Sequence, residues 1–262
     1  MKTRRLTLAL SALALAAASF AANADILFQN LGTAAPPATL GGHTMTQFDQ
    51  APQAAIPDGT SGIALIPGAP MGGTLGISAA ASKFTVGNGW GTSETWGHGY
   101  LGPVFYSTSN PVTLTLPAGT KAFYFYTQSS WVGTWNITAT TDSGTSSGPI
   151  SVSSGFSAPT GANGFGFYST AGESIISISV TSSTSPGLGF AEFGISDGTL
   201  ATTCASEGYT GLKLDWCRNI CEKDYTGTQL KLWIRRWMDR YHDLPYCMRE
   251  DEETPPQEQG AF

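Results

Sequence analysis

Charge is distributed very unevenly along this chain of 262 residues. The segment from Asp25 to Gly198 contains ten charged side chains, whereas the shorter segment from Thr199 to Phe262 contains nineteen and all four cysteines. A long segment rich in Gly, Ser and Thr with so few charges is typical of a β domain. The break predicts a β-sandwich domain at 25–198 and a cysteine-bearing helical module at 199–248. A disordered acidic, proline-containing tail is expected at 249–262.

The first 24 residues have the three parts of a secretory signal peptide. Lys2, Arg4 and Arg5 give a positive start, residues 6–20 are uncharged and mostly apolar, and Ala-Asn-Ala at 22–24 supplies small residues for cleavage. The apolar run of about fifteen residues is shorter than the roughly 20 that a membrane span needs. We therefore expect cleavage after residue 24. The protein should be secreted without a membrane span, and should lie in the periplasm, outside the cell or at its surface.

Export predicts an oxidising environment, in which four cysteines form two disulfides. The cysteines are Cys204, Cys217, Cys221 and Cys247. A zinc site is the alternative, because Cys217 and Cys221 lie one helical turn apart, but their spacing resembles no common structural zinc pattern. Two thiols on one helix face would pair with each other only under strain. Each is expected to pair outward, with Cys204 or Cys247, and the choice between these two stays open.

The charge balance argues against polyanionic partners. Loss of the three signal-peptide cations takes the formal net charge from −6 to −9. The β domain holds only Lys83 and Lys121 against eight carboxylates. Nucleic acids and anionic membranes bind clustered Lys and Arg. We therefore expect no nucleic-acid partner.

Short alternating runs between turn residues predict the architecture of the β domain. Apolar residues alternate with hydroxyl residues at 112–116 and 176–180, which gives each strand one buried face and one solvated face. About ten such strands suit one two-sheet antiparallel, jelly-roll-like β-sandwich. The fold class is thus mainly β, with a small disulfide-stapled αα-hairpin at the C-terminus. Further strands are predicted at 25–31, 44–48, 83–86, 104–107, 135–140 and 150–153.

The β domain contains an internal echo. Phe-Tyr-Phe-Tyr at 123–126 precedes a hydroxyl-rich strand at 136–140, and Phe-Gly-Phe-Tyr at 165–168 precedes another at 176–180. Two occurrences are too few for a solenoid, which needs at least three stacked units. We interpret them as two related strand pairs within one domain.

These motifs carry a resemblance. Together with the Asp-Ser-Gly turn at 142–144 and Gly-Phe-Ala-Glu-Phe-Gly-Ile at 189–195, the echo resembles β-sandwich ectodomains of exported Gram-negative proteins, many of them PEP-CTERM proteins. The resemblance covers about residues 25–198. It implies a jelly-roll-like sandwich and association with a matrix or with surface polysaccharide. The chain departs from the family in lacking the Pro-Glu-Pro signal, the hydrophobic helix and the basic stop.

The C-terminal module repeats Tyr-Thr-Gly-x-x-Leu at 209–214 and 225–230. Thr210 and Thr226 are good N-caps, so helices are predicted at 211–222 and 228–241. A module this small needs its disulfides to fold. It also resembles an uncharacterised Cys/Trp helical module of exported proteobacterial proteins. The residues expected to face inward are Leu214, Cys217, Cys221, Leu230, Trp233, Ile234 and Trp237.

Catalytic motifs are absent from the sequence. His43, His98 and His242 are far apart, and no nucleophile elbow, zinc-binding His pair or phosphate loop occurs. Asp49, Glu94 and Glu192 would need to meet in space to form a glycosidase pair. Solvated or turn-forming carboxylates are the simpler interpretation, so we expect no catalytic residue and no enzyme. No cofactor is expected, although Asp25, Asp49 and Glu192 leave a calcium site open.

The segment 90–100 is the most suggestive candidate for binding. Trp90, Glu94, Trp96, His98 and Tyr100 lie among glycines and hydroxyl residues, a composition that favours a loop over a strand. Exposed flat rings stack on sugars, and the polar side chains can bond sugar hydroxyls. The alternative is that the two tryptophans cover one end of the core.

Three functions follow in order of preference. The first is a secreted, non-catalytic protein that binds an extracellular glycan or matrix component through the aromatic loop. The second is a structural component of a surface layer or biofilm matrix, with self-association through strand edges and the C-terminal module as a docking element. The third is a secreted hydrolase.

Overall fold

The computed structural model describes residues 25–91, 96–129, 133–154, 161–170, 172–182, 187–223 and 225–249. The predicted signal peptide and residues 250–262 lie outside these ranges. Within them, no helix is both long and apolar enough to cross a membrane. The chain divides into two compact units. The β unit runs up to Gly41 and from Met45 to Gly198, and the helical unit contains Gly42–Thr44 and the residues from Thr199 onward.

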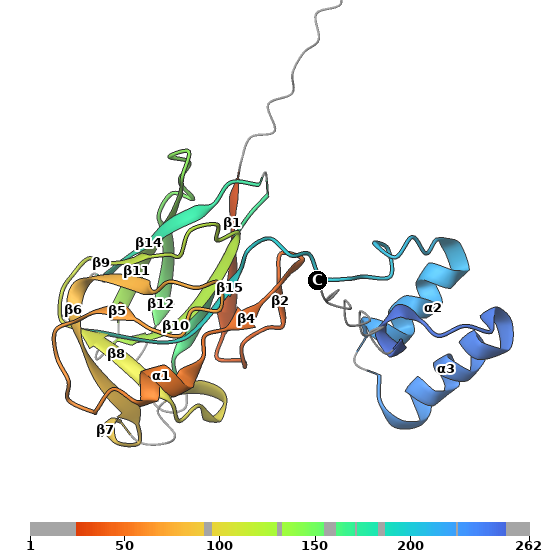
Figure 1. The fold of residues 1–262 in the computed structure, drawn as a ribbon, viewed down its shortest axis with the longest axis horizontal. Helices are drawn as coiled ribbons and strands as arrows, with labels where there is room; N and C mark the ends of the chain where they lie inside the picture. Colours follow the sequence, from red (N-terminus) through yellow and green to blue (C-terminus); the bar gives the residue numbers. More distant parts are fainter. Residues whose placement is uncertain are drawn as a thin grey trace, which may run out of the picture. The chain divides into compact units, whose positions relative to one another are not determined.

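Antiparallel strands dominate the chain up to Ser196 (Figure 1). A short helix, α1 (Gln50–Ala54), and a 3-10 turn at Gly97–Gly99 interrupt them. The strands are β1 (Ile26–Gly32), β2 (Thr39–Leu40), β3 (His43–Thr44), β4 (Thr46–Gln47), β5 (Ile63–Ile66), β6 (Leu75–Val86), β7 (Gly89–Trp90), β8 (Pro103–Ser107), β9 (Val112–Thr115), β10 (Ala122–Ser129), β11 (Gly133–Thr141), β12 (Ile150–Ser154), β13 (Asn163–Ser169), β14 (Ile175–Ser182) and β15 (Leu188–Ser196).

One large curled sheet replaces the two separate sheets that the sequence predicts. Its order is β1-β13-β10-β15-β8-β6-β9-β14-β11-β12, with β4 beside β15, and β5 and β7 beside β6. The long strand β6 makes the sheet continuous. Its residues Gly76 and Ile77 pair with β9, whereas the stretch from Ser82 to Thr85 pairs with β8. The expectation of a mainly antiparallel β fold is confirmed, and the two-sheet sandwich is corrected to a half-barrel.

The alternation of β10 separates two cores. Successive side chains of a strand point to opposite faces, so Phe123 and Phe125 enter the inner core while Tyr124 and Tyr126 enter a second core on the other face. All four side chains are fully buried. The inner core also takes aromatic side chains from neighbouring strands, namely Phe105, Trp135, Phe165, Phe167, Phe190 and Phe193.

The two halves of the sequence echo pair directly with each other. The aromatic strands β10 and β13 are antiparallel neighbours, with Phe123 opposite Phe167. The hydroxyl-rich strands β11 and β14 are neighbours as well, with Ile137 opposite Val180. The segments that resemble each other in sequence are therefore also hydrogen-bonded neighbours in the sheet.

The helical unit contains α2 (Gly211–Cys221), α3 (Gly227–Tyr241) and a 3-10 turn at Tyr246–Met248. Cys217, Ile220 and Trp237 are buried between the helices, and the inward-facing residues predicted from the sequence pack around them. Thr210 and Thr226 lie at the N-cap positions, but neither side chain makes a capping hydrogen bond. The two helices thus begin within one residue of the predicted starts, but the predicted capping hydrogen bonds of the threonine side chains do not form.

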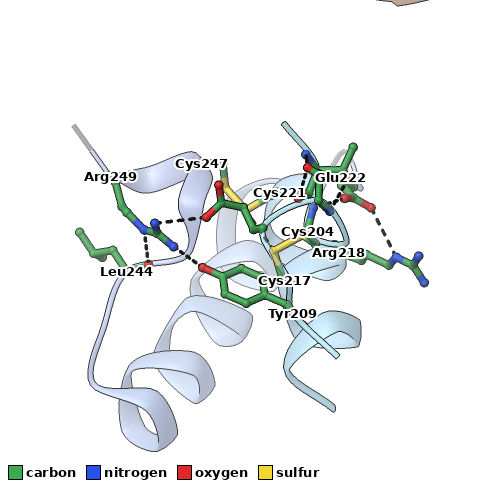
Figure 2. Close-up of a disulfide and its surroundings, with 12 residues drawn as sticks. Cys204, Tyr209, Cys217, Arg218, Cys221, Glu222, Leu244, Cys247 and Arg249 are labelled. Atoms are coloured by element: carbon green, nitrogen blue, oxygen red, sulfur yellow. Dashed lines mark hydrogen bonds and ion pairs between the residues drawn. A yellow bond between two sulfur atoms is a disulfide. The ribbon is translucent and has the colours of Figure 1, made fainter. Parts of the chain in front are cut away.

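Both predicted disulfides form, and each cysteine of α2 pairs outward. Cys204 bonds Cys217, and Cys221 bonds Cys247 (Figure 2). Arg249, which the sequence places in a disordered tail, is instead held in the unit. Its guanidinium donates to the carbonyl of Leu244 and the hydroxyl of Tyr209, and lies 3.2 Å from the carboxylate of Glu207. Arg249 therefore belongs to the helical unit.

Candidate functional site

Glu192 is the only carboxylate among the described residues that is buried. It lies in β15, all of whose residues are buried. The pairing of β15 with β10 shifts register here, from Tyr124 opposite Gly194 to Tyr126 opposite Ala191. Such a bulge re-aims a side chain, and Glu192 adopts a left-handed backbone with φ 52°. Its carboxylate reaches the second core.

Two side chains from the loop before β8 bind this carboxylate. The indole N–H of Trp96 donates to Oε2 of Glu192 over 2.7 Å. The Nε2 atom of His98 lies 2.7 Å from Oε1. His98 also has a left-handed backbone, with φ 45°. Both carboxylate oxygens are therefore engaged, and the loop is fixed to the sheet by residues more than 90 positions away in sequence.

The second nitrogen of His98 contacts the backbone of another segment. Nδ1 lies 3.3 Å from the carbonyl oxygen of Thr33. A carbonyl only accepts hydrogen bonds, so this contact favours the tautomer that is protonated at Nδ1. His98 thus links the carboxylate of Glu192 to the segment around Thr33.

Burial controls the electrostatics of the second core. Desolvation raises the pKa of Glu192, and the hydrogen bond and charge of His98 and the hydrogen bond from Trp96 oppose that rise. Desolvation and the charge of Glu192 also raise the pKa values of Tyr100 and Tyr126. These phenols stay protonated and donate, Tyr100 to the carbonyl of Pro103 and Tyr126 to that of Ala34.

The loop packs closely against neighbouring backbone. A Cβ on Gly97 would lie 3.0 Å from the carbonyl oxygen of Thr33 and 3.4 Å from that of Ala162. Only glycine fits there without displacing one of these segments. The ring of Trp96 contacts the rings of Trp90 and Tyr100, with centroids 6.4 and 5.8 Å away.

Burial of the two tryptophans corrects the expectation of an exposed aromatic loop. Trp90 is 9% and Trp96 is 3% exposed. The Trp90 indole N–H donates to the side-chain oxygen of Gln128 over 2.9 Å. The two rings cover a core, which is the alternative left open by the sequence. Tyr100 is partly buried and His98 is exposed, while Glu94 lies outside the described residues.

The three residues considered for calcium have separate partners. Asp49 caps α1 by accepting from the backbone N–H of Ala51. Glu192 is bound by His98 and Trp96, while the backbone of Asp25 bonds Thr170. In the described part of the chain, no group of three acidic or histidine side chains lies close enough to hold an ion; the one candidate group is Cys204, Cys217 and Cys221. The structure does not assemble a calcium site from these residues.

A second polar cluster, centred on Lys83, was not predicted. The side chain of Lys83 is buried and its ammonium lies 2.6 Å from the carboxylate of Asp58. Thr85 and Asn88 also donate to that carboxylate. The hydrogen bond from Lys83 is the largest of the effects that lower the pKa of Asp58. The cluster ties the turn after Pro57 to β6, and the Lys83 ammonium supplies the positive charge beside the carboxylate.

An aromatic cage surrounds Lys213 in the helical unit. Its ammonium lies 4.9, 5.2 and 4.9 Å from the ring centres of Tyr209, Trp237 and Tyr241. The carboxylate of Asp243 lies 3.0 Å away. Such cation–π contacts contribute about 0.5–1 kcal/mol each at exposed sites. The cage joins α2 to α3 independently of the disulfides.

No protein-family model matches the chain, and a search of characterised proteins gives no match. One solved structure with a detectable likeness holds the CBM22-1 and GH10 modules of endo-1,4-β-D-xylanase 10B from Clostridium thermocellum, in complex with xylohexaose. The identity is 12% and the TM-score 0.29, over 47% of this chain and 26% of that one. At this TM-score the likeness supports no argument about fold or ligand.

Proposed function

We propose that the protein is a secreted, non-catalytic binding protein whose β unit binds a neutral glycan beside the Glu192–His98 pair. The proposal rests on the contact between two residues that both have left-handed backbone conformations. His98 and Glu192 are two of the three described residues other than glycine with positive φ, and they bind each other. Strained backbone of this kind persists only where surrounding contacts hold it, and it concentrates at ligand clamps and active sites.

The chemistry of the pair favours a neutral ligand rich in hydroxyl groups. The carboxylate of Glu192 is buried and already bound by Trp96 and His98, so it presents no free charge to a ligand. The side chain of His98 is 15% exposed and that of Glu192 is 6% exposed. His98 and the partly buried ring of Tyr100 offer a polar edge beside an apolar face, the combination that small-molecule sites use to orient a ligand. In this arrangement the buried tryptophans position the loop and do not stack on the sugar.

The hydrogen bonds of Glu192 support a non-catalytic role. Both of its oxygens already accept hydrogen bonds or share a proton within the protein. A general acid must deliver its proton to the substrate, and this carboxylate is committed to Trp96 and His98. The hydrolase alternative needs a second carboxylate facing an aromatic cleft at roughly 5 to 10 Å.

Secretion is supported by the two disulfides, which persist in oxidising compartments. It also rests on the predicted signal peptide. The matrix role implied by the family resemblance is compatible with a glycan ligand, because a matrix presents polysaccharide to any protein embedded in it.

The test is affinity electrophoresis of residues 25–262 through gels that contain neutral polysaccharides. His98→Asn removes the imidazole but keeps a residue that tolerates left-handed backbone. His242→Asn is the matched control, since His242 has φ 59° and lies at the end of α3. We expect wild type and H242N to be retarded equally and H98N to lose at least tenfold in affinity. No retardation of wild type, or equal retardation of both variants, would overturn the proposal.

A structural role is the second candidate, and the ends of the sheet favour it. The sheet terminates at β1 and β12, whose outer edges pair with no strand that the structure describes. Leu27 on β1 is 42% exposed. Unpaired strand edges are templates for association with another chain. Sedimentation velocity at increasing concentration tests this role, and a strictly monomeric protein would rule out self-association through these edges.

A further inference from the structure

The four cysteine sulfurs form one cluster, although they are divided between two bridges. The Sγ atoms of Cys217 and Cys221 lie 4.0 Å apart, with no bond between them. The sulfurs of Cys204, Cys217 and Cys221 all lie within 4.8 Å of one another. Cys247 joins the cluster through its bond to Cys221. Figure 2 shows the two yellow bridges side by side next to α2.

This arrangement is close to that of a structural zinc site. Four thiolates bind Zn²⁺ tetrahedrally at about 2.3 Å, which places neighbouring sulfurs about 3.8 Å apart. The contact between Cys217 and Cys221 is already near that value. Within each bridge the two sulfurs would move apart on reduction, and the Cα atoms of both bridged pairs stand 5.7 Å apart.

Contacts other than the bridges hold the backbone on both sides of the cluster. The backbone N–H of Cys204 donates to Oε1 of Glu222 over 2.7 Å, which fixes the first cysteine at the end of α2. The indole N–H of Trp237 donates to the carbonyl of Asp243 over 2.8 Å, within the connection that leads from α3 to Cys247. Arg249 adds its bonds on the far side of Cys247. In the folded unit these contacts would keep the four sulfurs close together even without the bridges.

The geometry points to a redox-dependent metal site: after reduction by a dithiol, the helical unit binds one Zn²⁺ through Cys204, Cys217, Cys221 and Cys247. Two disulfides take up four electrons and four protons to give four thiols, while two dithiol molecules are each oxidised to a disulfide. Binding of Zn²⁺ by four thiolates releases four protons. Metal binding would then supply the folding free energy that the bridges supplied before.

Burial indicates the order of events. Cys204 and Cys217 are fully buried, whereas Cys247 is exposed. A reductant therefore meets the Cys221–Cys247 bridge first. The thiolate released on Cys221 lies 4.0 Å from Cys217 and can bind a metal together with it once the second bridge is reduced.

The experiment uses residues 25–262, reduced with a phosphine under argon and titrated with Co²⁺ in place of Zn²⁺. We expect saturation at one Co²⁺ per chain, with the visible absorption of tetrahedral cobalt thiolate and its loss when Zn²⁺ is added. Helical circular dichroism lost on reduction in a chelator should return with the metal. The oxidised protein should bind none.

Cys204→Ser/Cys217→Ser is the matched variant, because it leaves two thiols, including the exposed one. It should lose the tetrahedral absorption. The inference is overturned if the reduced wild type gives no cobalt–thiolate absorption, or if the double variant binds Co²⁺ with the same spectrum and affinity. It is also overturned if the metal binds but helicity does not return. None of these outcomes depends on whether the β unit binds a glycan.

Discussion

The β unit and the helical unit are stabilised in different ways, the first by a large apolar core and the second by disulfides around a small one. The inner core of the β unit contains 24 buried residues and no cysteine. The core of the helical unit contains four buried residues, two of which are the bonded cysteines Cys204 and Cys217. Leu212, Leu232 and Leu244 of the helical unit add little to its core, because they are 47%, 47% and 41% exposed. A large apolar core makes covalent bonds unnecessary, and a small one depends on them.

Reduction of both disulfides in the presence of a chelator tests this contrast, and we expect it to have the largest effect of the changes considered. Each bridge typically contributes about 2–4 kcal/mol, so loss of both should unfold the helical unit. The near-ultraviolet dichroism of the buried aromatics in the β unit should persist. Far-ultraviolet dichroism with and without reductant measures the change. Helicity that survives full reduction without metal would show that packing and the Lys213 cage suffice.

Truncation of one inner-core ring should be the next largest effect. The ring of Phe165 contacts those of Phe28, Phe125 and Trp135. Phe165→Ala should therefore destabilise the β unit by about 3–5 kcal/mol. Leu65→Ala, at a residue 59% exposed on β5, is the control and should change stability by no more than about 0.5 kcal/mol. Urea unfolding measures the free energy of unfolding of both variants, and equal losses would contradict a well-packed inner core.

The two ion pairs of the β unit should give pH dependences of opposite sign. Burial raises the pKa of Glu192 above its ordinary 4.5, so the folded protein keeps a proton that the unfolded chain has released. Stability should then fall as pH rises above 4.5, by at most about 1.4 kcal/mol per pH unit. The pKa of Asp58 is lowered from 3.8. Its contribution is present above 3.8 and is lost as pH falls below that value.

Glu192→Gln isolates the first of these terms. The amide can accept from Trp96 and donate to Nε2 of His98, as the protonated acid does. The variant should fold and lose the decline in stability above pH 4.5, while Asp58→Asn should lose only the acid-side term. Unfolding midpoints across the pH range measure both slopes. An unchanged decline in E192Q would assign it to another group.

Most strands could be predicted because alternation is a local property. The runs at 112–116 and 176–180 became β9 and β14, and the aromatic runs became β10 and β13. The helix α1 was missed, although Asp49, whose side chain accepts from the N–H two residues later, is a recognisable cap. The single curled sheet could not be predicted, because the alternation within β6 carries no sign that its two halves pair with different strands.

The candidate site was only partly predictable for a similar reason. Trp96, His98 and Glu192 were each singled out, but Trp96 and Glu192 are 96 residues apart, and their contact depends on a register shift in β15. One signal was available. Glu192 is the only charged residue in the apolar run 188–195, and a charge in a buried strand requires a partner. The isolated charge of Glu192 therefore predicts that this carboxylate has a partner, but it does not show that the partner is His98.

The pairing of the echoed strands has a geometric consequence. Phe123 corresponds to Phe165 in the echo and Phe125 to Phe167, and the observed pairs are Phe123 with Phe167 and Phe125 with Phe165. Ile137 and Ala139 pair reciprocally in the same way with Val180 and Ile178. This is the isologous pattern of a two-fold axis, in which one surface meets its own copy. The centre of the β unit therefore has an approximate two-fold symmetry within one chain.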